Sequence, residues 1–205
     1  MSGAAPLPPL VLVADSSAVG GRPLAQVVAQ AVAGGVRAVW LRDKQARPQT
    51  RRRLAAALAE VVHAAGGVLL ASPGPGTELA DGIQLGASDP WEPAGFGPRP
   101  VGRSCHGRDE LARAAAAGYD WATLSPIYPS AAKPGYGPVL GTGALAAAPL
   151  PVWALGGLSA ANAAECLVAG ASGVAVMGAV LAPADPEAAA ADICRVIGAL
   201  PEVSR

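Results

Sequence analysis

The sequence predicts a single α/β domain with the architecture of a (β/α)8 TIM barrel. Short apolar runs of strand length alternate with helix-like segments, and no break in composition marks a linker. Glycines and chemically distinctive residues follow most of these runs, as expected where the carboxyl ends of barrel strands carry the active-site loops. A doubly wound sheet would also alternate, but it usually has fewer strands and a glycine-rich fingerprint after the first one. We expect one barrel over residues 1–205, with 1–9 as an N-terminal extension and 201–205 as a tail.

The composition fits one hydrophobic core and argues against several classes of partner. Of the 205 residues, 52% are hydrophobic and 15% are charged, which suffices for one sizeable core but not for two. Fifteen basic residues balance fifteen acidic ones, so we expect neither nucleic acid nor a membrane surface as a partner. We find no signal-peptide pattern and no apolar run of about 18 residues, and the three cysteines are widely spaced. These features predict a cytoplasmic protein with reduced thiols.

The elements follow from apolar runs and the glycines and prolines between them. Predicted strands cover 10–14, 36–41, 68–71, 82–85, 100–103, 119–124, 152–155 and 173–177. Predicted helices cover 23–33, 51–65, 109–117, 160–168 and 186–200. Pro23 suits the first turn of its helix, and the arginine run 51–53 is interpreted as lying on a solvated helix side. The long loop 125–142 is interpreted as a lid over the site, with a flexible insertion as the alternative.

Glycine-rich turns follow the last two predicted strands. Gly156 and Gly157 follow the seventh strand, and Ser159 is well placed to cap the next helix. Met177 and Gly178 follow the eighth strand. Glycine lets backbone N–H groups approach a ligand closely, and a helix N-terminus adds donors and a favourable dipole. Together these turns predict a phosphate cradle at the carboxyl end of the barrel.

Two cations and a carboxylate follow the second and fourth strands. Arg42 and Lys44 stand in R-D-K, and alternation along the extended chain aims both at the barrel mouth. This pair suits a polyanion such as pyrophosphate, and a solvated charged turn is the alternative. Asp89 ends the segment GIQLGASD, where it is placed either to hold Mg²⁺ or to cap its turn.

Further polar groups follow the fifth and sixth strands. Ser104 and His106 point to the same side by alternation, and His106 is a candidate proton-transfer group because histidine is the residue type best suited to that task near neutral pH. A role for His106 in capping the following helix is the alternative. In the proposed lid, Ser130 and Lys133 supply a hydroxyl and an ammonium that can close on an anion.

Six motifs in a fixed order carry a family resemblance. They are R-D-K, G-I-Q-L-G-x-x-D, G-x-S-x-H, S-P-I-Y-P-S-x-x-K-P-G, A-L-G-G-L and G-V-A-V-M-G. In this set the chain resembles the thiamine phosphate synthase family, which also includes thiazole tautomerases, from residue 10 to about residue 200. The synthases couple a hydroxymethylpyrimidine pyrophosphate to a thiazole phosphate and release pyrophosphate with the help of Mg²⁺.

The resemblance implies a role for each matching position. Pyrophosphate would contact Arg42, Lys44, Ser104 and Lys133. Thiazole phosphate would be held by Ser130 and the backbones of Gly157 and Gly178. Asp89 would be a Mg²⁺ ligand, and Trp40 and Gln84 stand at substrate-binding positions. The expected partners are thus the two phosphorylated substrates, with a homo-oligomer left open.

The chain departs from the synthase pattern in four places. After the third strand the synthases carry an Asn-Asp pair, whereas this chain has Ser72-Pro73 and no carboxylate. Trp40 replaces a glutamine, Gln84 replaces a histidine, and Ala132 replaces a hydroxyl in the lid. These changes weaken the expected pyrophosphate half of the site and leave the phosphate cradle intact.

Two other functions therefore stay open. A thiazole tautomerase would aromatise a thiazole carboxylate phosphate and would need neither pyrophosphate nor a metal cofactor. Its catalytic histidine follows the sixth strand, where this chain has Ser125, so His106 would have to serve. The other alternative is a catalytically silent barrel that binds a phosphorylated metabolite.

Overall fold

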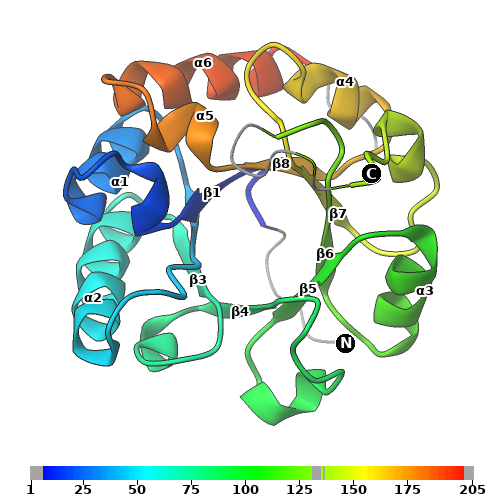
Figure 1. Ribbon diagram of the computed structural model, residues 1–205, viewed down its shortest axis with the longest axis horizontal. Coiled ribbons are helices and arrows are strands. Elements are labelled where there is room, and N and C mark those ends of the chain that lie inside the picture. Colours follow the sequence, from blue (N-terminus) through cyan, green and yellow to red (C-terminus); the bar gives the residue numbers. More distant parts are fainter. Residues whose placement is uncertain (1–6, 131–134, 136, 201–205) are drawn as a thin grey trace.

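The structure is a computed structural model that describes residues 7–130, 135 and 137–200. Within this part of the chain, parallel strands close into one barrel in the sequential order β1 to β8 (Figure 1). The strands are β1 Leu10–Ala14, β2 Ala38–Leu41, β3 Val68–Ala71, β4 Gly82–Leu85, β5 Val101–Cys105, β6 Trp121–Leu124, β7 Val152–Leu155 and β8 Gly173–Val176. Leu10 pairs with Val174 across the β1–β8 seam, which closes the ring. The predicted (β/α)8 barrel is confirmed.

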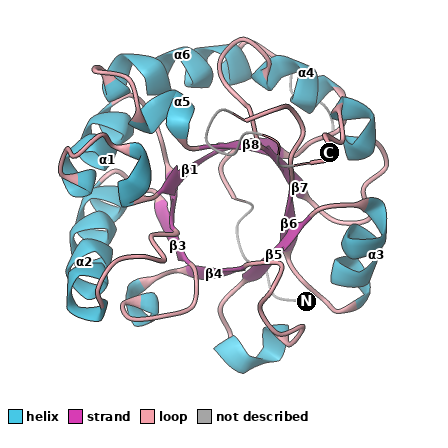
Figure 2. Cartoon of the chain, in the orientation of Figure 1, coloured by secondary structure: helices cyan, strands magenta, loops and turns pink. Residues whose placement is uncertain are grey.

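Helices cover the outside of the strand ring (Figure 2). They are α1 Leu24–Ala33, α2 Pro48–Ala64, α3 Arg108–Ala116, α4 Ala163–Val168, α5 Gly178–Leu181 and α6 Pro186–Gly198. Three crossovers carry only short 3-10 segments in the described chain: Thr77–Leu79, Pro93–Phe96 and Thr142–Leu145. The helical ring is therefore thin beside β4, at the bottom of Figure 1, and the chain completes the barrel with short connections. No helix in the described ranges is long and apolar enough to cross a membrane.

The start of α4 differs from the sequence prediction. The helix begins at Ala163 rather than at residue 160, and Ser159 is not its N-cap. The Ser159 hydroxyl accepts the N–H of Ala161 at 3.3 Å within the preceding turn. The Asn162 side-chain oxygen accepts the N–H of Ser159 at 2.9 Å. The polar residues thus close a turn before the helix, an arrangement that competes locally with helix formation.

Tryptophans fill the inside of the barrel, and strand glycines make room for them. Trp121 and Trp153 lie near the amino ends of β6 and β7 and belong to the interior cluster. A Cβ on Gly102 would lie 2.0 Å from Trp121 Nε1, and one on Gly173 would lie 2.2 Å from Trp153 Nε1. This pairing of the largest and smallest side chains packs the interior, which leaves the cavities to the carboxyl end of the strands.

Candidate active site

Two neighbouring cavities lie at the carboxyl end of the strands and share Arg42. The larger, about 400 Å³, lies over the ends of β5 to β8, extends to Val13 and Trp40 of β1 and β2, and is lined by His106, Gly156 and Gly178 among others. The smaller, about 270 Å³, lies beside the ends of β2 to β4 and is lined by Lys44 and other polar residues. Together the two cavities take lining residues from the carboxyl ends of all eight strands or the segments that follow them, and these lie on one face of the barrel, as the sequence predicts.

The glycine turns form one wall of the larger cavity. Gly156 and Gly157 have φ of +97° and +68°, in the left-handed region that favours glycine. A Cβ on Gly156 would lie 2.9 Å from Pro126 Cα, and one on Gly157 would lie 2.4 Å from the Pro129 oxygen. The loop after β6 therefore packs directly on this turn. Met177 and Gly178 line the cavity from β8, so the predicted cradle residues lie together.

Ser130, from the predicted lid, also lines the larger cavity. The ends of the lid that the structure describes are anchored to the barrel. The Tyr128 hydroxyl donates to Glu165 on α4 at 2.6 Å, and this hydrogen bond raises the pKa of Tyr128 to about 12. Lys133 and Ala132 lie outside the described residues, so the role expected for Lys133 stays a prediction.

His106 is fixed by the end of β6. Its Nδ1 lies 2.7 Å from the carbonyl oxygen of Ser125 and 3.3 Å from the hydroxyl of the same residue. A carbonyl oxygen can only accept a hydrogen bond, so Nδ1 carries the hydrogen and Nε2 is the basic nitrogen of the neutral ring. The backbone N–H of His106 donates to Glu110 in the first turn of α3 at 2.7 Å. The ring therefore lines the cavity in a defined tautomer, and the glutamate serves the start of the helix.

Gln84 lies inside the barrel beneath Ser104. Its side chain is buried, with its oxygen accepting from Trp121 Nε1 at 2.7 Å and its nitrogen donating to Ser104 Oγ at 3.3 Å. Thr123 completes this group through its own hydroxyl. Neither Gln84 nor Ser104 is among the residues that line the two cavities. The structure thus gives Gln84 a supporting contact to Ser104, and substrate contact by either residue stays a prediction.

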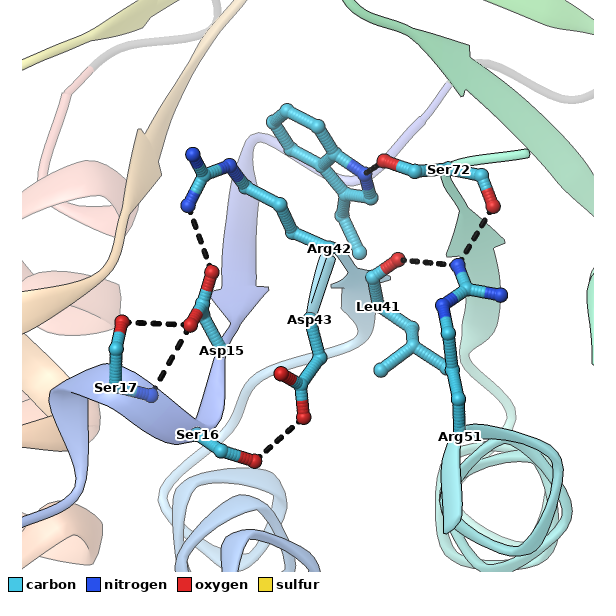
Figure 3. Close-up of polar contacts among 9 residues, drawn as sticks. Asp15, Ser16, Ser17, Leu41, Arg42, Asp43, Arg51 and Ser72 are labelled. Carbon is cyan, nitrogen blue, oxygen red and sulfur yellow. Dashed lines mark hydrogen bonds and ion pairs between the residues drawn. The ribbon is translucent and has the colours of Figure 1, made fainter. Parts of the chain in front are cut away.

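Asp15 holds Arg42 between the two cavities, a role that sequence reasoning missed. Arg42 Nη1 lies 2.7 Å from Asp15 Oδ2, and Asp15 also accepts the N–H and hydroxyl of Ser17 (Figure 3). Asp43, between the two predicted cations, is buried and accepts from Ser16 instead. The sequence did contain a signal for this role, because an acidic residue directly after β1 lies at the face where the carboxyl ends of the strands converge.

Arg51 is buried, contrary to the prediction of a solvated arginine run. It donates to the carbonyl oxygens of Ser72, at 2.6 Å, and Leu41 (Figure 3). It also donates to the carbonyl oxygen of Pro75 and thereby fixes the loop after β3. Burial lowers the pKa of Arg51 from its usual value. Trp40 stands beside this loop, where its Nε1 donates to Ser72 Oγ at 3.0 Å. Arg52 and Arg53 are exposed, as predicted.

Asp89 and Lys44 both line the smaller cavity, and both lie close to Gly86. Asp89 Oδ2 accepts the N–H of Gly86 at 2.6 Å, so the carboxylate closes its own turn as well as lining the cavity. A Cβ on Gly86 would lie 3.2 Å from Lys44 Nζ and 3.4 Å from Asp89 Oδ2. The turn-closing role weighed for Asp89 is therefore present, and its role as a Mg²⁺ ligand stays a prediction.

The side chains of the smaller cavity would fit Mg²⁺ only if a bound anion supplied further oxygen ligands. Asp89 is the one carboxylate among the described residues that line the smaller cavity, and the Ser72 hydroxyl is engaged by Trp40. The described chain holds no group of three acidic, histidine or cysteine side chains that could bind a metal. Mg²⁺ often binds through one or two carboxylates plus substrate phosphate oxygens. Asp89 fits that arrangement as a single protein anchor.

Comparison with known proteins places these features in a family. The family model for thiamine monophosphate synthase matches residues 10–180, which span all eight strands. The chain is 36% identical over 194 residues to the thiamine-phosphate synthase of Methanoculleus marisnigri, covering 88% of this chain and 91% of that protein. It is 35% identical over 198 residues to the thiamine-phosphate synthase of Roseiflexus castenholzii, covering 90% and 86%. Thiamine phosphate pyrophosphorylase from Pyrococcus furiosus shares the fold, with a TM-score of 0.81 at 24% identity over 92% of this chain and 95% of that one.

Proposed function

The chain belongs to the thiamine monophosphate synthase family of transferases, and on that premise we propose that it joins a hydroxymethylpyrimidine pyrophosphate to a thiazole phosphate to form thiamine phosphate. The observation that carries this proposal is the pair of cavities that meet at Arg42. One offers a glycine cradle suited to a single phosphate, and the other offers several cations suited to a diphosphate. Two substrates with these anionic groups would be brought together beside Arg42.

The thiazole phosphate is assigned to the larger cavity. Gly156, Gly157 and Gly178 bring the backbone close to the cavity, and Ser130 adds a hydroxyl. Backbone N–H groups of such turns bind phosphate oxygens without a side-chain charge. Apolar side chains such as Leu155 line the same space and suit a flat heterocycle.

The pyrophosphate is assigned to the smaller cavity. Arg42 and Lys44 line it and are placed to contact phosphate oxygens, while Arg51 adds buried positive charge behind the β3 loop. As the bond to the pyrimidine breaks, negative charge grows on the departing pyrophosphate. Fixed cations that face this charge lower the barrier. Ser104 and Lys133 are proposed as further contacts, as the resemblance implies.

Mg²⁺ belongs to this proposal through Asp89. The synthase family generally uses Mg²⁺. When bound, the ion would supply charge neutralisation on the leaving pyrophosphate, and Asp89 is the residue that would hold it. A cytoplasmic location and the two phosphorylated substrates as partners are proposed on the composition and the resemblance, and the oligomeric state stays open.

One observation favours a second candidate, a tautomerase-like isomerase. His106 lines the same cavity as the glycine cradle, and Ser125 fixes its tautomer. A histidine beside a bound thiazole carboxylate phosphate could move the proton that aromatises the ring. This reaction would use the larger cavity, and the cations of the smaller cavity would have no role in it.

An Arg42→Ala variant separates these functions, with Arg53→Ala as the control because Arg53 is exposed on α2. A synthase should lose thiamine phosphate formation with Arg42→Ala by about 100-fold or more, since one cation stabilising the developing charge is removed. The control should retain wild-type turnover. Isomerisation of thiazole carboxylate phosphate by a chain that makes no thiamine phosphate would replace the proposal with the second candidate. Binding of thiazole phosphate with neither activity would indicate the silent barrel.

A further inference from the structure

Arg103 in β5 is a fully buried arginine to which the family resemblance assigns no task. Its exposed fraction is 0%. Ser104, the next residue, contacts Gln84 inside the barrel. Because side chains alternate along a strand, Arg103 faces outward, toward the turn that follows β4. The contacts confirm this direction.

The Arg103 guanidinium binds both sides of the Asp89 turn. Nη2 donates to the carbonyl oxygen of Ala87 at 2.8 Å, and Nη1 donates to that of Pro90 at 2.8 Å. Asp89 lies between these two carbonyl groups in the sequence. The guanidinium carbon also lies 4.1 Å from the centre of the Trp91 ring, which anchors the end of the same turn.

Burial of the Arg103 guanidinium costs free energy, and a residue that only filled space would not need this charge. A buried guanidinium loses its hydration, and within the described chain Arg103 has no ion pair and its Nε has no hydrogen-bond partner. Two charge-assisted hydrogen bonds and contacts with the rings of Trp91 and Tyr119, the latter at 5.9 Å, offset this loss. Both hydrogen bonds and the closer ring contact act on residues 87–91, so the main effect of the buried charge is to fix this segment.

We infer that Arg103 is a positioning residue that holds Asp89 at the edge of the smaller cavity, so that Asp89 can anchor a metal-bound diphosphate. The inference rests on the proposed function, because it gives the Asp89 turn its ligand. The Asp89 carboxylate accepts the Gly86 N–H, and Arg103 donates to the carbonyl oxygens of Ala87 and Pro90, which flank Asp89 in the sequence. Loss of the two Arg103 hydrogen bonds would let the turn and its carboxylate move relative to Lys44, and the anion would lose a fixed metal anchor.

Arg103→Met and Arg113→Met form a matched pair of variants. Arg113 also stacks on Trp91, at 4.0 Å, but it is exposed on α3. Loss of Arg113 therefore removes a ring contact and leaves the hydrogen bonds to Ala87 and Pro90 in place. Arg103→Lys keeps the charge and can reach one carbonyl oxygen, so it provides a third variant if Arg103→Met does not fold.

The test measures the binding of inorganic pyrophosphate by calorimetry with and without Mg²⁺, and hydrogen–deuterium exchange of segment 86–91. Arg103→Met should weaken binding in the presence of Mg²⁺ by about tenfold or more, the usual effect of losing a residue that orients a metal ligand. Exchange in 86–91 should rise, Arg103→Lys should fall between, and Arg113→Met should match the wild type. Binding of thiazole phosphate should stay unchanged in all variants.

Three results would overturn the inference. The first is wild-type pyrophosphate binding by a folded Arg103→Met or Arg103→Lys variant. The second is an equal loss of pyrophosphate affinity in Arg113→Met, which would assign the effect to packing of Trp91. The third is a wild-type protein that makes thiamine phosphate but binds pyrophosphate no better with Mg²⁺. A wild-type protein that shows the Mg²⁺-dependent binding and forms no thiamine phosphate would refute the proposed function and leave the role of Arg103 supported.

Discussion

Replacement of Gly178 by valine is predicted to block ligand binding and to leave the fold intact. Gly178 begins α5 at the edge of the larger cavity, and a Cβ built on it meets no other atom within 4 Å. Its φ is not in the left-handed region, so a side chain there introduces no backbone strain. The valine methyl groups would occupy the space in which the phosphate is expected to lie.

The size of the effect follows from the contacts that the phosphate would lose. Loss of one charge-assisted hydrogen bond from the cradle removes about 1.5–3 kcal/mol, which raises Kd about 10- to 150-fold. Gly157 provides the contrast within the same cradle. Its φ is +68°, and its Cβ would lie 2.4 Å from the Pro129 oxygen. Gly157→Val should therefore unfold or destabilise the protein, whereas Gly178→Val should change binding alone.

The assay is calorimetric titration with thiazole phosphate, accompanied by thermal unfolding. Gly198→Val is the control, since Gly198 is exposed at the end of α6 and its Cβ would also meet nothing within 4 Å. The control and Gly178→Val should both melt near the wild type, and only Gly178→Val should bind weakly. Wild-type affinity in Gly178→Val would place the phosphate outside the cradle and refute the reasoning.

Three further predictions concern groups that the structure brought to light. Asp15→Asn should release Arg42 from its ion pair and lower kcat/KM for the pyrimidine pyrophosphate by about tenfold, the effect expected of a lost orienting contact, with little change in thiazole phosphate affinity. Arg51→Met should lower the free energy of unfolding in urea by about 1–3 kcal/mol, because buried carbonyl groups of the β3 loop lose their donor. Burial raises the pKa of Cys105 to about 12 and that of Cys166 to about 11, so at pH 8 both thiols should stay protonated and resist iodoacetamide until the protein is unfolded.

Each of these predictions has a contradicting result. An Asp15→Asn enzyme with wild-type kinetics would show that the ion pair does not position Arg42. Arg52→Met is the control for Arg51→Met because Arg52 is exposed, and an equal change in both would refute the role of the buried guanidinium. Rapid alkylation of the folded protein at either buried cysteine would show that the thiols are accessible.

Local patterns were sufficient to predict most of the barrel. The apolar run LVLVA gave β1 at Leu10–Ala14 because a strand buried on both faces needs continuous apolar residues. The ends of α4 were less predictable: Ser159 has the residue type of an N-cap, but Asn162 draws it into a preceding turn. Such competition depends on which hydrogen bonds form, and the residue type alone does not decide it.

The candidate site likewise contains some residues that could be predicted from the sequence and others that could not. Gly156 and Gly178 could be assigned to a phosphate cradle because the position of a turn after a barrel strand defines where it lies. Arg51 could not be assigned, because its burial depends on carbonyl groups of the β3 loop, which are more than twenty positions away for Ser72 and Pro75. The same holds for Asp15 and Arg42, which are 27 positions apart in the sequence and meet only when β1 and β2 pair.

If the two adjacent cavities bring two phosphorylated substrates together at Arg42, the purified chain must couple them. The most direct test incubates the purified chain with hydroxymethylpyrimidine pyrophosphate and thiazole phosphate, with Mg²⁺ or with excess EDTA, and measures both products. Thiamine phosphate and pyrophosphate should form in equal amounts with Mg²⁺, and both should be lost in EDTA. Absence of thiamine phosphate under both conditions, while thiazole phosphate still raises the melting temperature, would show that the two cavities do not serve this reaction.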